Sequence, residues 1–415
     1  MKTKHELELY LHIPFCVKKC NYCDFLSFSA DEQMQREYAK ALMREIEYYG
    51  SLMRERRVST IYIGGGTPSW LDCDLLIRIL DCVYRNFSVM QDAEISMECN
   101  PGTITREKMG DYRNAGINRL SIGLQSANGE ELQILGRIHT YEQFLKTYEL
   151  ARNCGFSNVN VDLMSGLPHQ TYEKFAKTLH QVVRLKPEHI SVYTLIIEKG
   201  TPFYEQYKFD AVKQEAGMDT EVLPNEEEAY RMMKGTQEIL SKAGYEQYEI
   251  SNFAKPGFAC RHNVGYWTRE NYLGMGLGAA SLIDNVRYRN VADIYSYIEE
   301  SAHIGLKELA YTQMENGKPV DRMVMGTGLH ETGEVLSRKS QMEEFMFLGL
   351  RMREGTSRSA FEQEFGISID GVYGEILQKL RDEELLEVQA GRIKLTERGM
   401  DLGNYCMAQF LLEES

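Results

Sequence analysis

The sequence predicts an α/β protein: an incomplete (β/α)6 barrel with an added α+β segment and a small C-terminal winged-helix-like domain. Between residues 7 and 197, short β-rich runs alternate with longer helix-like stretches, which is typical of βα units around a parallel sheet. Glycine and proline follow several of these runs, where a βα loop would begin. From residue 342 the pattern changes to three helix-like stretches and a hairpin.

Six β-rich runs predict six parallel strands. Their ranges are 7–13, 58–63, 94–99, 119–123, 158–163 and 189–195. Intervening segments such as 36–49 and 172–185 have the pattern of helices. Six units are too few for a closed eight-stranded barrel, so an incomplete barrel over residues 1–200 is favoured, although a doubly wound open sheet also fits.

The rest of the chain divides into three further parts. Residues 201–311 lose the alternation and are expected to add structure beside the barrel: an acidic helix near 225–243, a strand near 245–251 and a glycine-rich stretch at 272–280. Residues 312–340 resemble a linker. Residues 341–415 predict the winged-helix-like domain, whose excess of acidic residues favours a docking or lid role over binding in a DNA groove.

Composition excludes several classes of protein. A formal net charge of -14 argues against nucleic-acid binding, because phosphate contacts need clustered Lys and Arg. The sequence has neither a run of about 18 apolar residues nor the start of a signal peptide, so a cytoplasmic location without a transmembrane segment is expected. In that setting the nine cysteines are expected to be reduced thiols or metal ligands.

Three cysteines stand apart by their spacing. Cys16, Cys20 and Cys23 form a C-x3-C-x2-C loop directly after the first predicted strand, where three thiolates can converge on one metal centre. Thiolates hold iron-sulfur clusters, and three of them leave a fourth iron open to a ligand. Two alternatives stay open: a zinc site completed by His12, and inert buried cysteines.

With Tyr22 before the last cysteine, this spacing resembles the signature of the radical S-adenosylmethionine (SAM) superfamily. Residues 10–16, Tyr-Leu-His-Ile-Pro-Phe-Cys, resemble the opening of the oxygen-independent coproporphyrinogen dehydrogenase superfamily, which also contains the HemW haem chaperones. The resemblance implies a [4Fe-4S] cluster on the three cysteines, SAM on the open iron and an electron donor for the cluster. One electron passed to SAM would give a 5'-deoxyadenosyl radical.

Further candidate residues fall at or just after the ends of predicted strands, the face where barrel chemistry occurs. In the dehydrogenase branch, the residues that match Tyr10, Gly65 and Glu98 contact the SAM on the cluster. The residues that contact a second SAM match Tyr22, Gly66, Thr67, Gln125, Arg137 and Asp162. Most of these residues also have a simpler explanation. The glycine-rich turn can be structural, and Glu98 can be a solvated carboxylate. Gln125 can cap a turn, Arg137 can form a surface salt bridge, and Asp162 can form a hydrogen bond at a strand end.

Two departures from the dehydrogenase pattern favour the HemW branch. Phe25 occupies the place of an additional cysteine of the dehydrogenases, and the first strand begins within ten residues of Met1, without their N-terminal extension. Residues 261–267, Arg-His-Asn-Val-Gly-Tyr-Trp, match the H-N-x-x-Y-W motif associated with HemW. His262 is therefore a candidate haem ligand and Cys260 an alternative one. The motif also fits a buried aromatic core with a hydrogen-bonded imidazole.

The resemblance thus implies a haem chaperone that passes haem to apo-haemoproteins such as respiratory enzymes. Peripheral membrane association and a homodimer are both compatible with that role. The alternative function is oxygen-independent coproporphyrinogen III dehydrogenase, which forms protoporphyrinogen IX by oxidative decarboxylation. A third alternative is a radical SAM enzyme with another substrate. SAM cleavage is expected, whereas dehydrogenase activity is not favoured because of Phe25.

Overall fold

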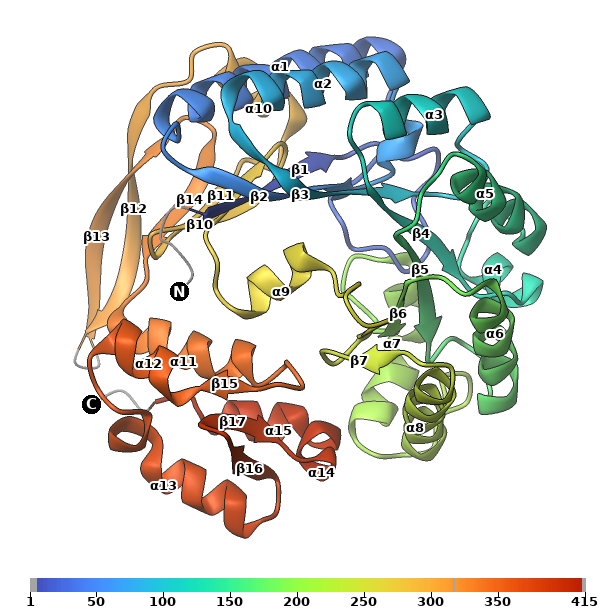
Figure 1. The fold of residues 1–415 in the computed structure, drawn as a ribbon, viewed down its shortest axis with the longest axis vertical. Coiled ribbons are helices and arrows are strands. Elements are labelled where there is room, and N and C mark those ends of the chain that lie inside the picture. Colours follow the sequence, from blue (N-terminus) through green and yellow to red (C-terminus); the bar gives the residue numbers. More distant parts are fainter. Residues whose placement is uncertain (1–5, 316–317, 413–415) are drawn as a thin grey trace.

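The computed structural model describes residues 6–315 and 318–412, and it contains the six predicted parallel strands (Figure 1). Each strand pairs in parallel with the next along the chain. The strands are β1 (Glu6–Ile13), β2 (Arg57–Gly65), β3 (Ser88–Cys99), β4 (Arg119–Gln125), β5 (Val159–Ser165) and β6 (His189–Thr194). The prediction of six parallel strands is confirmed. β3 is longer than predicted because Ser88 and Val89 also pair with β2.

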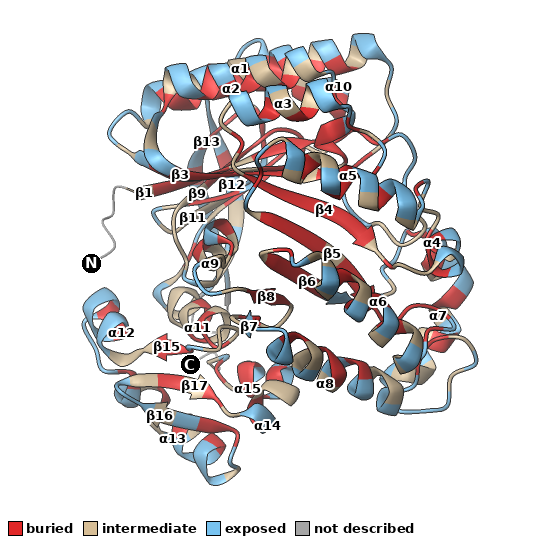
Figure 2. Ribbon diagram, turned by 45° about the vertical axis from the view of Figure 1, so that its right-hand side comes forward, coloured by how far each residue is buried: buried red, intermediate tan, exposed pale blue. Residues whose placement is uncertain are grey.

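The crossover helices cover the convex side of this sheet (Figure 1). They are α1 (Glu32–Leu52), α2 (Cys73–Asn86), α3 (Arg106–Asn114), α4 (Gly129–Ile134), α5 (Tyr141–Asn153) and α6 (Tyr172–Leu185), with a short 3-10 helix at Pro68–Trp70. Threonine side chains accept backbone N–H groups at the starts of α3, α5 and α6, which fixes where these helices begin. Figure 2 shows buried strands beneath helices whose outer faces are exposed.

The two faces of the barrel sheet differ in chemistry. On β1, Leu7, Leu9 and Leu11 are fully buried in the main hydrophobic core, whereas the alternating residues Glu8 and His12 are buried polar groups. Parallel strands covered on both faces are usually apolar throughout. The polar residues on the concave side therefore need partners inside the barrel or a bound ligand.

The segment after β6 extends the barrel sheet at both edges. β9 (Tyr272–Met275) pairs in parallel with β1, followed by the antiparallel strands β10 (Ala280–Ile283), β11 (Val286–Asn290) and β14 (His330–Val335). At the other edge, β8 (Asn252–Ala254) and β7 (Glu246–Gln247) lie antiparallel beyond β6. The helices of this segment are α7 (Pro202–Glu215), α8 (Glu226–Lys242), α9 (Arg261–Trp267) and α10 (Ile294–Ser301).

The segment lies beside the barrel as expected, and its strands continue the barrel's own sheet. One expectation for it needs correction. The single strand expected at 245–251 is divided between β7 and β8, because the buried Glu249 carboxylate accepts hydrogen bonds from the Ser251 N–H and the Asn252 side chain and so turns the chain between them. The acidic helix expected near 225–243 is confirmed as α8.

The stretch expected as a linker is also structured. β12 (Leu306–Glu315) and β13 (Lys318–Thr327) form an antiparallel hairpin, and β14 follows. One side of the hairpin packs inward through Leu309 and Val324, which are 7% and 9% exposed. The other side carries exposed residues such as Met323 and Met325. Half of the residues of each strand face outward and many of these are polar. The composition of the hairpin therefore resembles that of a linker.

The C-terminal part has its own hydrophobic core, centred on residues such as Phe361, Tyr373 and Leu380. Its elements are α11 (Arg338–Gly349), β15 (Thr356–Ser357), α12 (Arg358–Phe365), α13 (Ile369–Asp382), β16 (Leu386–Gln389), β17 (Arg392–Leu395), α14 (Glu397–Asp401) and α15 (Gly403–Ala408). The expected three helices and hairpin are present, and β15 adds a third strand to the hairpin.

Among the described residues, no helix combines the length and the apolarity that crossing a bilayer requires.

Candidate SAM and iron-sulfur site

A cavity of about 460 Å³ opens at the carboxyl ends of the barrel strands, within the size range of small-molecule sites. The loop that carries the three cysteines forms one wall, and the ends of β2 to β6 form the others. The predicted residues on its surface are Cys16, Cys20, Cys23, Tyr22, Gly65, Gly66, Thr67, Glu98, Gln125, Arg137 and Asp162. Tyr10, His262 and the alternative haem ligand Cys260 lie outside this lining.

Backbone hydrogen bonds hold the cysteine loop against the barrel. The Cys16 N–H donates to the Phe28 carbonyl over 3.0 Å, and the Asn21 N–H donates to the Leu135 carbonyl over 3.0 Å. Gly136 permits this docking, since a Cβ at that position would lie 2.9 Å from the Asn21 side chain. The loop is therefore fixed at the start of the C-x3-C-x2-C motif and between its second and third cysteines.

The thiols suit a cluster better than a single zinc ion. A tetrahedral zinc site with bonds of about 2.3 Å brings its sulfur ligands within about 3.8 Å of one another. Within residues 6–315 and 318–412, no three His, Cys, Asp or Glu side chains lie close enough to share one metal ion. In a cubane each thiolate binds a different iron, so three thiols spread around one cavity fit that group.

His12, the fourth ligand in the zinc alternative, has both ring nitrogens engaged. Nδ1 lies 3.0 Å from the Tyr10 hydroxyl, and Nε2 lies 2.9 Å from the Leu26 carbonyl oxygen. Burial lowers the pKa of His12, and its ring packs where a Cβ on Gly65 would stand, 2.4 Å from His12 Cε1. The geometry therefore favours a structural role for His12 over zinc binding.

Glu98 and the glycine-rich turn form the part of the cavity where the resemblance places SAM. Glu98 Oε2 accepts from the Gly65 N–H over 3.1 Å, and Oε1 accepts from the Tyr62 hydroxyl over 3.1 Å. Gly65 has a φ of +113°, which favours glycine. Burial, followed by the Asp162 charge, raises the pKa of Glu98 to about 7. This carboxylate is thus preorganised and easily protonated.

Arg137 connects the cysteine loop to the strand ends. Its Nη2 donates to Asn100 Oδ1 and to the Gly123 carbonyl, both over 2.8 Å, while Nη1 lies 3.6 Å from Cys20 Sγ. Burial lowers the pKa of Arg137, but Tyr22 and Cys20 outweigh that effect and raise it. Its buried Nε has no hydrogen-bond partner within the described part of the chain. A buried cation with a spare donor at a cavity wall fits an anionic ligand group such as a carboxylate.

Asp162 and Gln125 line the cavity from β5 and β4. Asp162 accepts hydrogen bonds from Ser121 Oγ over 2.7 Å and Asn160 Nδ2 over 2.8 Å, and burial raises its pKa. The chain bulges between Gly123 and Gln125, where Gln125 takes a φ of +69°. Bulges of this kind often occur beside ligand sites, where they redirect a side chain.

Two of the cavity residues that were not predicted from the sequence support predicted ones. Tyr62 and Asn100 hold Glu98 and Arg137, respectively. Alternation along β2 was the available signal for Tyr62, since it shares the concave face with Thr60. Tyr10 stacks on Tyr62 with ring centroids 6.3 Å apart, so Tyr10 lies behind the cavity wall.

The H-N-x-x-Y-W motif forms helix α9 on the concave side of the sheet (Figure 1). His262 is 1% exposed, and its nitrogens lie 2.7 Å from Thr60 Oγ1 and 3.0 Å from the Tyr266 hydroxyl. Cys260 is fully buried, and burial raises the pKa of its thiol to about 12, so it is a poor source of thiolate. This arrangement favours the buried-imidazole alternative over haem ligation.

Comparisons with known proteins identify the family of the chain. Residues 10–182 match the family model of the radical SAM superfamily, and residues 336–402 match the HemN C-terminal domain. The chain is 33% identical to "Heme chaperone HemW" of Lactococcus lactis, over 98% of this chain and 97% of that protein. It is 35% identical to "Heme chaperone HemW" of Bacillus subtilis, over 97% and 99% of the two chains. The solved structure of coproporphyrinogen III oxidase (HemN) from Escherichia coli, a radical SAM enzyme, superposes with a TM-score of 0.80 at 26% identity, over 98% of this chain and 90% of that one.

Proposed function

The chain belongs to the HemW haem-chaperone family of the radical SAM superfamily, and on that premise we propose that it binds a [4Fe-4S] cluster, SAM and haem, and passes the haem to apo-haemoproteins. Cys16, Cys20 and Cys23 would hold three irons of the cluster. When bound, the cluster supplies one electron to SAM.

One observation carries the cofactor part of the proposal: the three thiols and the SAM candidates line a single cavity. Glu98 offers a carboxylate for the ribose hydroxyls, and Gly65 allows close approach of the methionine amino group. Arg137 offers a buried cation for a carboxylate. The family resemblance gives the matching residues these roles or contact with a second SAM, and either assignment supports a ligand in this cavity.

The mouth of the cavity supports haem binding. Phe25 and Ile196 are 69% and 68% exposed and line the opening, where apolar side chains can pack on a porphyrin face. The exposed Lys18 and Lys19 line the same cavity and suit the two propionates of haem. Haem would therefore lie over the cluster loop, close to SAM.

Anaerobic reconstitution tests the proposal. We expect about four irons and four sulfides for each chain, binding of SAM, a Soret band on titration with haem, and transfer of that haem to apomyoglobin. The Phe25→Asp variant should lower haem affinity while iron content and SAM binding stay at wild-type levels. Zinc in place of iron, or the absence of haem binding by the wild-type protein, would contradict the proposal.

A second candidate function is oxygen-independent coproporphyrinogen III dehydrogenase, favoured by the full-length likeness to the HemN structure. Phe25 replaces the additional cysteine of that branch, so we expect at most trace activity. Incubation of the reconstituted protein with coproporphyrinogen III, SAM and a low-potential reductant decides between the two functions. Multiple turnovers to protoporphyrinogen IX would identify an enzyme.

A further inference from the structure

We infer, on the basis of the SAM site proposed above, that His262 is a positioning residue for SAM binding, because it holds the Tyr62 ring against Glu98. The role goes beyond the haem ligation that the motif was expected to provide. His262 would touch neither SAM nor haem.

A continuous set of contacts connects His262 to the cavity. The imidazole stacks on the Tyr62 ring, with centroids 5.2 Å apart and planes inclined by 23°. Tyr10 contacts the same tyrosine ring at 6.3 Å and 24°. The Tyr62 hydroxyl then donates to Glu98 Oε1 over 3.1 Å. Loss of the imidazole would leave a space beside Tyr62 and allow the ring to move away from Glu98.

The imidazole is itself held in one orientation. Thr60 Oγ1 lies 2.7 Å from Nδ1, and the Tyr266 hydroxyl lies 3.0 Å from Nε2. Burial and the nearby Arg119 charge lower the pKa of His262 to about 3, so the ring is neutral and has one donor and one acceptor nitrogen. The two hydroxyls can satisfy either tautomer. Ligation of haem iron would require one of these bonds to break.

Helix α9 cannot easily move to release His262. At its N-terminus, the Glu94 carboxylate accepts from the N–H groups of Arg261 and His262 over 3.2 and 3.3 Å. In its middle, Gly265 passes so close to Glu8 that a Cβ would lie 2.1 Å from Glu8 Oε1. The helix is therefore docked on β1 and β3 at two points.

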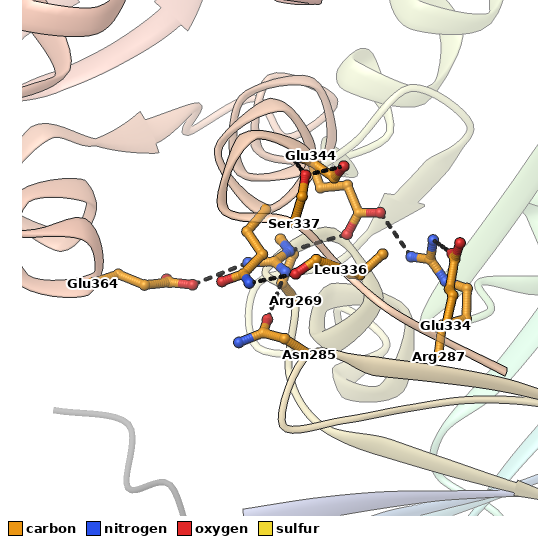
Figure 3. A network of polar contacts seen from close by, with 10 residues as sticks. Arg269, Asn285, Arg287, Glu334, Leu336, Ser337, Glu344 and Glu364 are labelled. Atoms are coloured by element: carbon orange, nitrogen blue, oxygen red, sulfur yellow. Dashed lines mark hydrogen bonds and ion pairs between the residues drawn. The ribbon is translucent and has the colours of Figure 1, made fainter. Parts of the chain in front are cut away.

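The C-terminal domain holds the other end of α9 (Figure 3). Arg269 follows the helix with a φ of +56°, and its guanidinium donates to Glu344 over 3.2 Å and to Glu364 over 3.0 Å. Arg351 lies over the Trp267 ring, 4.3 Å from its centroid. The motif thus connects the C-terminal domain to the wall of the SAM cavity.

Two substitutions separate positioning from ligation. His262→Ala removes the ring, whereas His262→Phe keeps a ring that can stack on Tyr62 but has no nitrogen ligand. We expect about tenfold weaker SAM binding in His262→Ala, the lower range for a lost hydrogen bond to a charged group, and at most about threefold in His262→Phe. The haem Soret band should be unchanged in both. The assay is equilibrium dialysis of SAM with anaerobically reconstituted protein, alongside haem titration.

The exposed His180 of α6 provides the control, and His180→Ala should match the wild type in both measurements. Loss of the Soret band in both His262 variants would show ligation and overturn the inference, as would wild-type SAM affinity in His262→Ala. If His262→Phe does not fold, the pair Tyr62→Phe and Tyr62→Phe/His262→Ala decides: equal SAM affinities support the inference, and additive losses refute it. Failure of the wild-type protein to bind SAM would instead refute the proposed function.

Discussion

SAM binding should weaken as the pH falls through 7, because Glu98 must be ionised to accept hydrogen bonds from the ribose. Burial, then the Asp162 charge, raises the pKa of Glu98 to about 7, although the Gly65 N–H and the Tyr62 hydroxyl oppose the shift. A bound ligand that needs the carboxylate lowers this pKa by linkage. The direction follows: protons compete with SAM at acidic pH, and the competition ends at alkaline pH.

The magnitude follows from the fraction of Glu98 that is ionised. With a pKa of about 7, that fraction is about nine-tenths at pH 8 and one-tenth at pH 6. SAM affinity should therefore fall about tenfold between these values, or about 1.4 kcal/mol. At pH 7, binding should release about half a proton per SAM.

Titration calorimetry of the reconstituted protein measures both quantities, with two buffers of different ionisation enthalpy to count protons. Glu98→Gln is the matched control, since its amide does not titrate. Because the SAM amino group and Asp162 also titrate, the diagnostic quantity is the difference between wild type and variant. Equal pH slopes for the two proteins would refute the reasoning, even if the variant bound SAM more weakly at every pH.

Three further predictions concern the cluster, the turn and the core. Cys23→Ser should lose most of the bound iron and sulfide while haem binding persists, as measured by metal analysis and haem titration; full iron content would remove Cys23 from the cluster ligands. Gly65→Ala should lower the free energy of unfolding by about 2 kcal/mol in denaturant titration, because the new Cβ meets His12 at a left-handed φ; an unchanged midpoint would show that the turn can adapt. Burial raises the pKa of Glu45 to about 7. The free energy of unfolding should therefore be highest below the ordinary pKa of 4.5 and should fall by about 3 kcal/mol as the pH rises through 7, because Glu45 ionises at a lower pH in the unfolded protein than in the folded protein. Glu45→Gln should flatten the dependence of stability on pH between pH 5 and 8, and an unchanged dependence would show that Glu45 does not cause it.

The sequence predicted the barrel well because its signals are local. Each barrel strand combines an apolar outer face with a glycine, proline or polar residue at its carboxyl end, and both features can be read within about ten residues. Since parallel strands end on one side of the sheet, candidates as distant as Cys16 and Asp162 could be expected to share a site. The structure places both of them in the same cavity.

The sequence was less informative where long-range contacts decide the structure. The residues of the β12 and β13 hairpin have the pattern of a linker, because only Leu309, Val324 and a few neighbours face inward. The pairing of β9 with β1 joins residues more than 260 positions apart, and no local sequence pattern predicts this pairing. Tyr62 supports the site because its hydroxyl lies within hydrogen-bond distance of Glu98 on the next strand, and this contact depends on the folded sheet.

The composition of α9 can be understood from the polar interior that it covers. Below the cavity, the concave face of the sheet presents Thr60, Glu94 and Arg119, all nearly inaccessible to water. Buried polar groups without partners are costly. The His262 ring pairs with Thr60, and the backbone N–H groups at the start of α9 pair with Glu94. The histidine at this position therefore has a structural role in the barrel interior whether or not haem is present. On this reasoning the motif marks the support of the SAM site, and recognition of haem falls to the exposed residues at the mouth of the cavity.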